Sequence, residues 1–473
     1  MLSLYYTGNK GIIYFLRGGE TMKQIMKTFL TLAIMAVGMI TGSSVALAEN
    51  YVPVNAANFP DTAIRNALER IVKESVSSDD ELGENTEYIE YDFGSSGTFR
   101  RDSSGVLSVD TDSVEYLSVY GTDGTVYSAD CIKKFSGLRY FTAEKYGASS
   151  FTSDQNLFYV SLGGVSTASL KVSASHAQVV DVSGLKSLKS VTVNAPKALS
   201  VMVNGQKITK ISFGNMSGLE TLSLGGQLKS FDVSKYTKLK GFYISAPVTK
   251  LTGMKKLKQL ESVSISKTGL KALDFSTNKK LKYVGCISNK RLTSLKLPSA
   301  VVSLYATDNN IKSLNLKNLK KLIYLSVNGN KNLKTLDVSK NKNLTSLNAG
   351  CTKVSKLNLA NNKKLTSLSC YQTKLNSLNL KKNTKLKYLS FYGSKIKKLN
   401  LSKQKKLTLS FETKKGKTIS LKNYIGSGYK AVNQSDALSY SKKTGKIKVK
   451  KKGYSRLTLK KGSRVFYVEI YAK

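Results

Sequence analysis

Leucines recur at a nearly constant spacing in the C-terminal half of this chain. One series is separated by 22, 21, 21 and 21 residues: Leu322, Leu344, Leu365, Leu386 and Leu407. A second series has the same spacings and lies half a period out of phase: Ile311, Leu333, Val354, Leu375 and Ile396. A fixed period of about 21 residues predicts a solenoid, in which each coil stacks on its neighbours.

Each period contains a phrase with strand character. In LTSLSCY (365–371), Leu368 and Cys370 are two positions apart, so they face the same side of an extended chain. The positions equivalent to Cys370 in the other periods are all apolar: Cys286, Ala306, Val327, Ala349 and Phe391. We therefore expect one short strand per coil, with this column in the core.

Two further columns are polar. The first follows the strand: Asn289, Asn309, Asn330, Thr352, Thr373 and Ser394. The second lies in the opposite half-coil: Asn341, Asn362, Asn383 and Gln404. Small polar side chains hydrogen-bond the backbone where a chain bends, so we interpret both columns as structural.

The period sets the domain boundaries. It begins loosely at Val114 and becomes regular after Leu188, and about 12 coils fit between residues 150 and 410. After Leu409 apolar and polar residues alternate, which predicts four or five antiparallel strands in a small β-sandwich that caps the last coil. The expected fold is mainly β: a solenoid over 114–410 and a C-terminal β module over 411–473.

The N-terminal region carries a secretory signal. Lys23 and Lys27 precede a 12-residue apolar run, too short to span a bilayer, and 46–48 (ALA) forms a cleavage site. We expect residues 1–48 to be removed, and residues 1–21 to lie upstream of the natural start at Met22. Residues 49–113 then form a cap, with one amphipathic helix after Pro60 and an acidic stretch read as a loop or linker.

Charge is distributed unevenly along the chain. Residues 49–181 carry 10 Lys and Arg against 20 Asp and Glu, a net charge of −10, whereas residues 182–473 carry 61 against 9, a net charge of +52. The C-terminal two-thirds should therefore attract polyanions or an acidic surface.

The repeats resemble the leucine-rich repeats of secreted and surface proteins of Gram-positive gut bacteria, the internalin-like and BspA-like groups. LDVSKNKNLTSLNAG (336–350) and LNLANNKKLTSLSC (357–370) are close to that pattern, and NFPDTAIRNAL (58–68) is similar to a motif that precedes such repeats. The resemblance implies a leucine-rich-repeat architecture but names no ligand, since such repeats serve many partners. Residues 412–473 resemble a bacterial immunoglobulin-like module.

The chain departs from these relatives at their calcium loop. The corresponding segment, RDSSGVLSVD (101–110), has only Asp102 and Asp110 as carboxylates and lacks the alternating acidic ligands of a calcium site. One histidine, His176, excludes a histidine-cluster metal site. We therefore expect no metal and no cofactor.

Lysines provide the first candidate surface. They occupy one column just before the strand phrases: Lys320, Lys321, Lys342, Lys363, Lys364, Lys385, Lys405 and Lys406. Stacked charges repel, and a bound polyanion such as an anionic wall polymer or a sulfated glycan would relieve that repulsion. Alternatively, the lysines only keep the solenoid soluble.

Tyrosines provide the second candidate surface. Five are singled out as ligand-binding candidates on the strand face: Tyr305, Tyr324, Tyr371, Tyr388 and Tyr392. Tyr283 shares their pattern. Such rings suit protein or sugar contacts, because they bury area at low entropic cost. The alternative is packing between coils without a ligand.

Catalysis is not expected. Cys131 and His176 could form a thiol–imidazole couple, but neither is flanked by a nucleophile turn or an oxyanion loop. Cys286, Cys351 and Cys370 are read as core thiols, too far apart or misaligned for disulfides.

The sequence thus predicts a secreted, non-catalytic protein whose positive charge would allow association with the cell wall. Two interpretations stay open: an adhesin-like module that recognises an extracellular protein or glycan, and a scaffold held electrostatically by anionic wall polymer. We expect no nucleic-acid partner and no membrane span after signal cleavage.

Overall fold

The fold was analysed in a computed structural model, which describes residues 51–59, 62–75, 88–92, 98–102, 104, 107–120, 129–144 and 146–473. At the ends of a few elements only the backbone is described. The predicted signal segment, residues 1–48, lies outside the described residues. Residues 50–473 form one compact unit.

The cap consists of one helix and a small antiparallel sheet. Helix α2 (Thr62–Ser75) buries Ile64, Leu68 and Val72, so the predicted amphipathic helix is confirmed. The sheet has the order β1 (Tyr51–Pro53), β4 (Leu107–Asp110), β3 (Thr98–Asp102), β2 (Tyr88–Asp92). Strand β2 lies in the acidic stretch that we expected to be a loop, so that expectation is wrong for residues 88–92. The many charged residues of this stretch gave no strand pattern, and the strand forms because its backbone pairs with β3.

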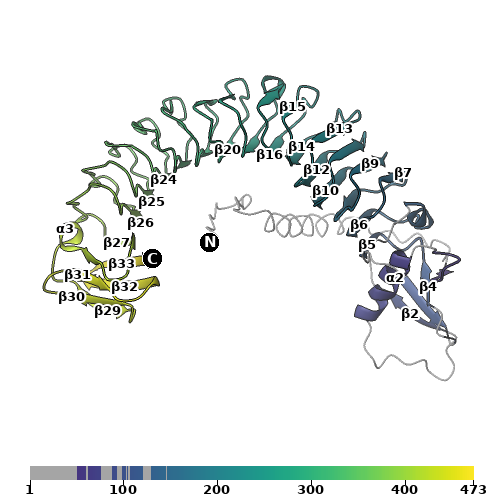
Figure 1. The fold of residues 1–473 in the computed structure, drawn as a ribbon. Coiled ribbons are helices and arrows are strands. Elements are labelled where there is room, and N and C mark those ends of the chain that lie inside the picture. The colour runs from purple at the N-terminus through teal and green to yellow at the C-terminus, as the bar shows by residue number, and fades with distance from the viewer. Residues whose placement is uncertain are drawn as a thin grey trace. The chain divides into compact units, whose positions relative to one another are not determined.

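The solenoid contributes one parallel strand per coil to a continuous sheet (Figure 1). Between residues 150 and 410 there are 13 such strands, close to the 12 expected. In chain order the strands of this sheet are β5 (Tyr116–Tyr120), β6 (Tyr140–Glu144), β8 (Tyr159–Leu162), β10 (Val179–Leu185), β12 (Ser200–Gly205), β14 (Thr221–Gly225), β16 (Gly241–Ser245), β18 (Ser262–Ser266), β20 (Tyr283–Ile287), β22 (Ser303–Tyr305), β23 (Tyr324–Ser326), β24 (Ser346–Asn348), β25 (Ser367–Ser369), β26 (Tyr388–Ser390) and β27 (Lys406–Thr413).

The opposite half-coils form strands only in the first part of the solenoid. One parallel sheet has the order β13 (Lys210–Phe213), β11 (Ser190–Asn194), β9 (Ser169–Ala174), β7 (Ser150–Ser153). Two pairs follow, β15 (Ser230–Asp232) with β17 (Lys250–Thr252), and β19 (Ala272–Asp274) with β21 (Ser294–Lys296). Short 3-10 helices, η2 (Ala129–Lys134) and η3 (Met254–Lys256), complete the connections.

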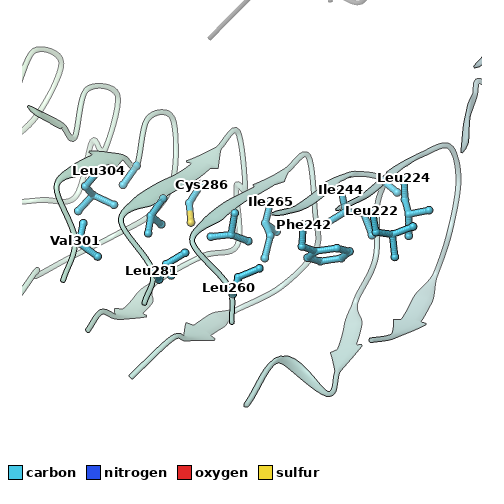
Figure 2. Close-up of a cluster of buried hydrophobic side chains, with 14 of the residues drawn as sticks. Leu222, Leu224, Phe242, Ile244, Leu260, Ile265, Leu281, Cys286, Val301 and Leu304 are labelled. Atoms are coloured by element: carbon cyan, nitrogen blue, oxygen red, sulfur yellow. The ribbon is translucent and has the colours of Figure 1, made fainter. Parts of the chain in front are cut away.

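The core is a stack of apolar columns between the two halves of each coil (Figure 2). Leu281, Cys286 and Leu304 are fully buried there, and each lies next to the equivalent side chain of the neighbouring coil. The column predicted from Cys370 is confirmed, because each of its residues is buried: Cys286, Ala306, Val327, Ala349, Cys370 and Phe391. The repeat thus stacks side chains at equivalent positions of adjacent coils on one another.

A left-handed residue turns the chain after each strand. In seven successive coils the residue at this position has a positive φ, between 50° and 75°: Lys267, Ser288, Asp308, Gly329, Cys351, Gln372 and Gly393. The next residue belongs to the first polar column. There Asn309 donates from Nδ2 to the carbonyl of Cys286 (2.7 Å), and its Oδ1 accepts from the backbone N–H of Asn289 (2.9 Å).

The second polar column, on the other side of the coil, uses only its donors. The side-chain oxygens of Asn341, Asn362, Asn383 and Gln404 are buried and accept no hydrogen bond from any residue that the structure describes. Asn362 donates from Nδ2 to the carbonyls of Val338 (3.0 Å) and Asn341 (2.9 Å), and Asn383 repeats this geometry one coil later. These asparagines are fully buried. The structural interpretation of both polar columns is confirmed, since these side chains hydrogen-bond the backbone of the turns and of the neighbouring coils.

The C-terminal module continues the solenoid sheet. Strand β33 (Arg464–Ala472) pairs in parallel with β27, and then β32 (Gly453–Lys461) and β29 (Lys430–Gln434) pair antiparallel. A second sheet has the order β28 (Thr418–Ser420), β31 (Lys446–Val449), β30 (Leu438–Ser441), and a short helix, α3 (Lys422–Ile425), follows β28. We expected only antiparallel strands, which is wrong for β27 and β33. Alternation indicates a strand but does not fix its direction.

Candidate binding face

The solvent-facing side of the long sheet presents two columns of side chains in register. We call these two columns, on β5 to β27, the polar face. Its first column contains Tyr116, Tyr140, Tyr159, Val179, Ser200, Thr221, Gly241, Ser262, Tyr283, Ser303, Tyr324, Ser346, Ser367, Tyr388 and Thr408. Its second column contains Ser118, Thr142, Ser161, Asp181, Met202, Ser223, Tyr243, Ser264, Gly285, Tyr305, Ser326, Asn348, Ser369, Ser390 and Ser410.

The polar face is almost free of charge. Its two columns contain no lysine or arginine and one carboxylate, Asp181. This contrasts with residues 182–473, where 61 basic residues outnumber 9 acidic ones. Ser, Tyr, Gly and Asn dominate the face instead, and these are the residues that antibody recognition loops favour for adaptable hydrogen bonding and rigid contact area.

The predicted tyrosines all lie on this side of the sheet. Tyr283, Tyr324 and Tyr388 occupy the first column, half-buried, at intervals of two and three coils. At a strand spacing of about 4.8 Å their backbones lie about 10 and 14 Å apart. Tyr305 occupies the second column. Tyr371 and Tyr392 lie two residues beyond that column in their own coils, just after the ends of β25 and β26.

Tyr371 and Tyr392 form the centre of a polar cluster beyond the strand ends. Their rings stack with centroids 5.0 Å apart and planes inclined by 12°. The Tyr371 hydroxyl donates to Asn328 Oδ1 (2.8 Å), and the Tyr392 hydroxyl donates to Glu412 Oε2 (3.0 Å). Glu412 also forms an ion pair with Lys473. We call these residues the tyrosine cluster; it joins four coils to the C-terminal strand.

Glycines make room for the rings. A Cβ on Gly350 would lie 2.4 Å from Cε1 of Tyr371, and one on Gly241 would lie 3.1 Å from the ring of Tyr243. The Tyr371 ring therefore lies against the preceding coil and the Tyr243 ring against its own strand β16, and both side chains are half-buried.

The tyrosine cluster is fully protonated on its hydroxyls near neutral pH. Burial, with a contribution from Cys351, raises the pKa of Tyr371 to about 12. Burial and the Glu412 carboxylate raise the pKa of Tyr392 as well. The hydrogen bond from Lys473 lowers the pKa of Glu412 below its usual value. Glu412 is thus an anionic acceptor that holds the Tyr392 hydroxyl in one orientation.

The lysine column lies outside the polar face. Seven of its lysines precede the strands, and Lys406 is the first residue of β27. All eight lysines are exposed. Lys364 donates to Asn343 Oδ1 (2.7 Å). In the described part of the chain, none of the eight is within ion-pair distance of a carboxylate, so this column keeps an uncompensated positive charge.

Two of the three described cysteines are core residues, as expected, but Cys351 is not. Cys286 and Cys370 are buried, and burial raises the pKa of each thiol to about 12. Cys351 is half-exposed, and its Sγ donates to Gln372 Oε1 (3.1 Å). It occupies the left-handed turn position, which points away from the core. All three thiols are free.

The thiol–imidazole couple considered from the sequence lies partly outside the described residues. His176 contacts the hydroxyl of its neighbour Ser175 (3.0 Å from Nδ1), and the side chain of Cys131 lies outside the described residues. No group of three His, Cys, Asp or Glu in the described ranges could hold a metal ion. Asp110 is described, whereas the side chain of Asp102 is not.

No local sequence pattern indicated the hydrogen-bond and ion-pair partners of the tyrosine cluster. Glu412 and Lys473 lie beyond the point where the period ends, and Asn328 precedes Tyr371 by two periods. The only sequence signal was the repeat phase, which places Asn328, Gly350, Tyr371 and Tyr392 at equivalent positions. The repeat does not predict the position of Lys473, because this residue follows β33, a strand outside the repeats that joins the sheet only in the tertiary fold.

Each coil of about 21 residues contributes one parallel strand, apolar side chains to the core and, at the turns, buried polar side chains that form ladders. The chain folds as a leucine-rich-repeat solenoid. No family model and no curated protein sequence matches it. Among solved structures it is similar to the functional domain of InlJ from Listeria monocytogenes, described as including a cysteine ladder, with 18% identity over 90% of this chain and 100% of that one and a TM-score of 0.43.

Two further solved structures are similar at comparable levels. An internalin of Listeria monocytogenes, InlF, shares 16% identity over 74% of this chain and 94% of that one, with a TM-score of 0.48. A leucine-rich-repeat protein of Leptospira interrogans shares 16% identity over 60% and 86%, with a TM-score of 0.46. At these identities the likeness concerns the fold alone. Across the described ranges, the helices are too short or too polar to cross a membrane.

Proposed function

We propose that this is a secreted, non-catalytic binding protein whose polar face recognises an uncharged surface of an extracellular protein or glycan. The observation that carries the proposal is the contrast in charge. A face without lysine or arginine persists through a segment with a net charge of +52, and Ser, Tyr, Gly and Asn occupy most of its positions.

Geometry supports this proposal. Tyr324 and Tyr388 present half-buried rings on rigid strands, so little side-chain entropy is lost when a partner covers them. Tyr305 and the stacked pair Tyr371 and Tyr392 extend the aromatic area toward the strand ends. Between the rings, serine and asparagine hydroxyls and amides offer hydrogen bonds without a fixed charge.

The test is binding of the mature protein, residues 49–473, to panels of glycans and extracellular proteins at low salt and at about 0.5 M salt, where charge contacts are screened within a few ångströms. We expect a ligand whose affinity survives high salt and falls at least about tenfold in the double variant Tyr324→Ser and Tyr388→Ser. Tyr454→Ser is the matched control, because Tyr454 is 58% exposed but lies on β32, outside the polar face. Equal losses in both variants would contradict the proposal.

A second function, retention on anionic wall polymer, is favoured by one observation. The eight lysines of the lysine column are exposed, without ion pairs within the described residues, and separate from the polar face. The test is sedimentation with purified cell walls at low and high salt. Binding that is lost at high salt and weakened by Lys363→Gln with Lys385→Gln, but not by Tyr324→Ser with Tyr388→Ser, would assign retention to these lysines. Salt-resistant sedimentation would contradict it.

A further inference from the structure

The boundary between the last coil and the C-terminal module contains a basic pocket. It has a volume of about 430 Å³ and is lined by residues of three segments: 398–402 of the last coil, 422–426 around α3, and Arg464 at the start of β33. The Leu-Asn-Leu segment of the last coil is repeated at 357–359, where the corresponding cavity has only about 50 Å³. The larger space arises because α3 and β33, rather than another coil, cover this end.

The polar lining carries positive charge only. Lys398, Lys422 and Arg464 contribute three cations, and no Asp or Glu lines the pocket. Asn400, Ser402 and Asn423 add neutral polar groups. Among the described residues none of the three cations is within ion-pair distance of a carboxylate, so the charge of the pocket is uncompensated.

Arg464 is held in place but only partly satisfied. Its Nη2 donates to the carbonyl of Leu401 (2.8 Å), and its guanidinium lies 5.2 Å from the ring centre of Phe466 and 5.7 Å from that of Tyr429. Its Nε is shielded from solvent and has no acceptor. A half-buried guanidinium without a counterion is costly, and a planar donor fixed by its neighbours is suited to an oxyanion.

The pocket is also rigid. The backbone N–H of Leu399 donates to the carbonyl of Asn423 (3.1 Å), which ties the last coil to α3. On the other side Arg464 is the first residue of β33, where it pairs with Lys461 of β32, and β33 pairs with β27 from Val465 to Ala472. Lys398 and Lys422 therefore stand on two elements whose backbones are fixed relative to Arg464, so binding an anion needs ordering of the two lysine side chains but no rearrangement of the backbone.

We propose that this junction pocket binds a tetrahedral oxyanion, the phosphate or sulfate group of an anionic ligand. Arg464 donates to it from the inside, and Lys398 and Lys422 neutralise it from the rim. The site is distinct from the polar face and from the lysine column. It differs from the lysine column in being concave and in fixing one group, so its binding is saturable with one anion per chain.

The test is isothermal titration calorimetry of the mature protein with inorganic phosphate and with sulfate, at constant ionic strength set by chloride. We expect saturable binding of one anion with a Kd of about 1 mM. Glycerol 3-phosphate and a sulfated monosaccharide then distinguish the two sources of the oxyanion. Absence of saturable binding for all four probes would overturn the proposal.

Variants separate the pocket from the general positive charge. Lys398→Gln with Lys422→Gln should weaken binding about tenfold, since each exposed charge contact is worth a factor of about two to five. Lys363→Gln with Lys385→Gln removes the same charge from the lysine column and should leave the Kd unchanged. Equal weakening by both pairs would show diffuse attraction and overturn the proposal. Neither pair touches the polar face, so loss of recognition there is a separate outcome.

Discussion

The ring of Tyr371 stacks on the ring of Tyr392, which follows it by one coil, at a centroid distance of 5.0 Å. The two hydroxyls point in opposite directions along the solenoid, one to Asn328 and the other to Glu412. A chain of contacts thus crosses from the regular repeats into the strand that begins the C-terminal module. The cluster fixes two tyrosines that lie beside the polar face and links them to the module.

Gly350→Ala should destabilise the protein by displacing the ring of Tyr371. The new methyl group would lie 2.4 Å from Cε1 of that ring, and overpacking of this kind costs about 1–3 kcal/mol. Urea unfolding measures the change. Gly218→Ala is the control, because its nearest neighbouring atom would lie 3.9 Å away. A Gly350→Ala variant as stable as Gly218→Ala would show that the ring does not rest there.

Asn362→Ala should cost at least about 2 kcal/mol of unfolding free energy. It leaves the carbonyls of Val338 and Asn341 without their side-chain donor in a buried position. The adjacent Asn361→Ala is the control. Its side chain is exposed and donates only to the carbonyl of Ser339 (3.2 Å), so a change within about 0.5 kcal/mol is expected. Similar costs at the two positions would contradict the ladder interpretation.

Native thiol labelling should distinguish the cysteines. In a Cys131→Ser background, iodoacetamide should modify Cys351 and leave Cys286 and Cys370 unmodified until the protein unfolds, since both are buried. Burial raises the pKa of Cys351, so its thiolate is scarce at pH 8 and the labelling rate should rise about tenfold per pH unit below that pKa. Mass spectrometry identifies the modified site. Labelling of Cys370 in the native protein would contradict the assigned core column.

Glu412→Gln should change the pH dependence of stability. The pKa of Glu412 is lowered in the folded state, chiefly by the hydrogen bond from Lys473, so its contribution is fully present above the unfolded pKa and is lost as the pH falls through the folded value. The wild-type protein should exceed the variant by about 0.2–1 kcal/mol at pH 7, since the pair is largely exposed.

The same difference should disappear when the pH is lowered below the folded pKa of Glu412. Chemical unfolding at a series of pH values measures it. Glu469→Gln is the matched control, because Glu469 lies on the neighbouring strand β33 and Lys473 is paired with Glu412 instead. A wild-type advantage that persists unchanged into the acidic range would show that the carboxylate charge is not responsible.

Much of the solenoid followed from the sequence by itself. The spacing of Leu322, Leu344 and Leu365 determines one coil per period, because each coil can bury its apolar side chains only against an identical neighbour. The same phase placed Cys370 in the core and Asn362 at a turn. Local alternation of apolar and polar residues did not reveal β2. It also led us to expect Cys351 in the core, whereas this residue occupies a turn with a left-handed backbone.

Tertiary structure decided the features that connect different parts of the chain. Parallel pairing of β33 with β27 brings Lys473 to Glu412 and Arg464 to the last coil, and no local pattern specifies that partner. The tyrosine cluster and the junction pocket exist only through this pairing. Periodicity fixes contacts between equivalent positions of adjacent coils, whereas a strand that ends the repeat finds its partner through the backbone hydrogen bonds left open at the edge of the sheet.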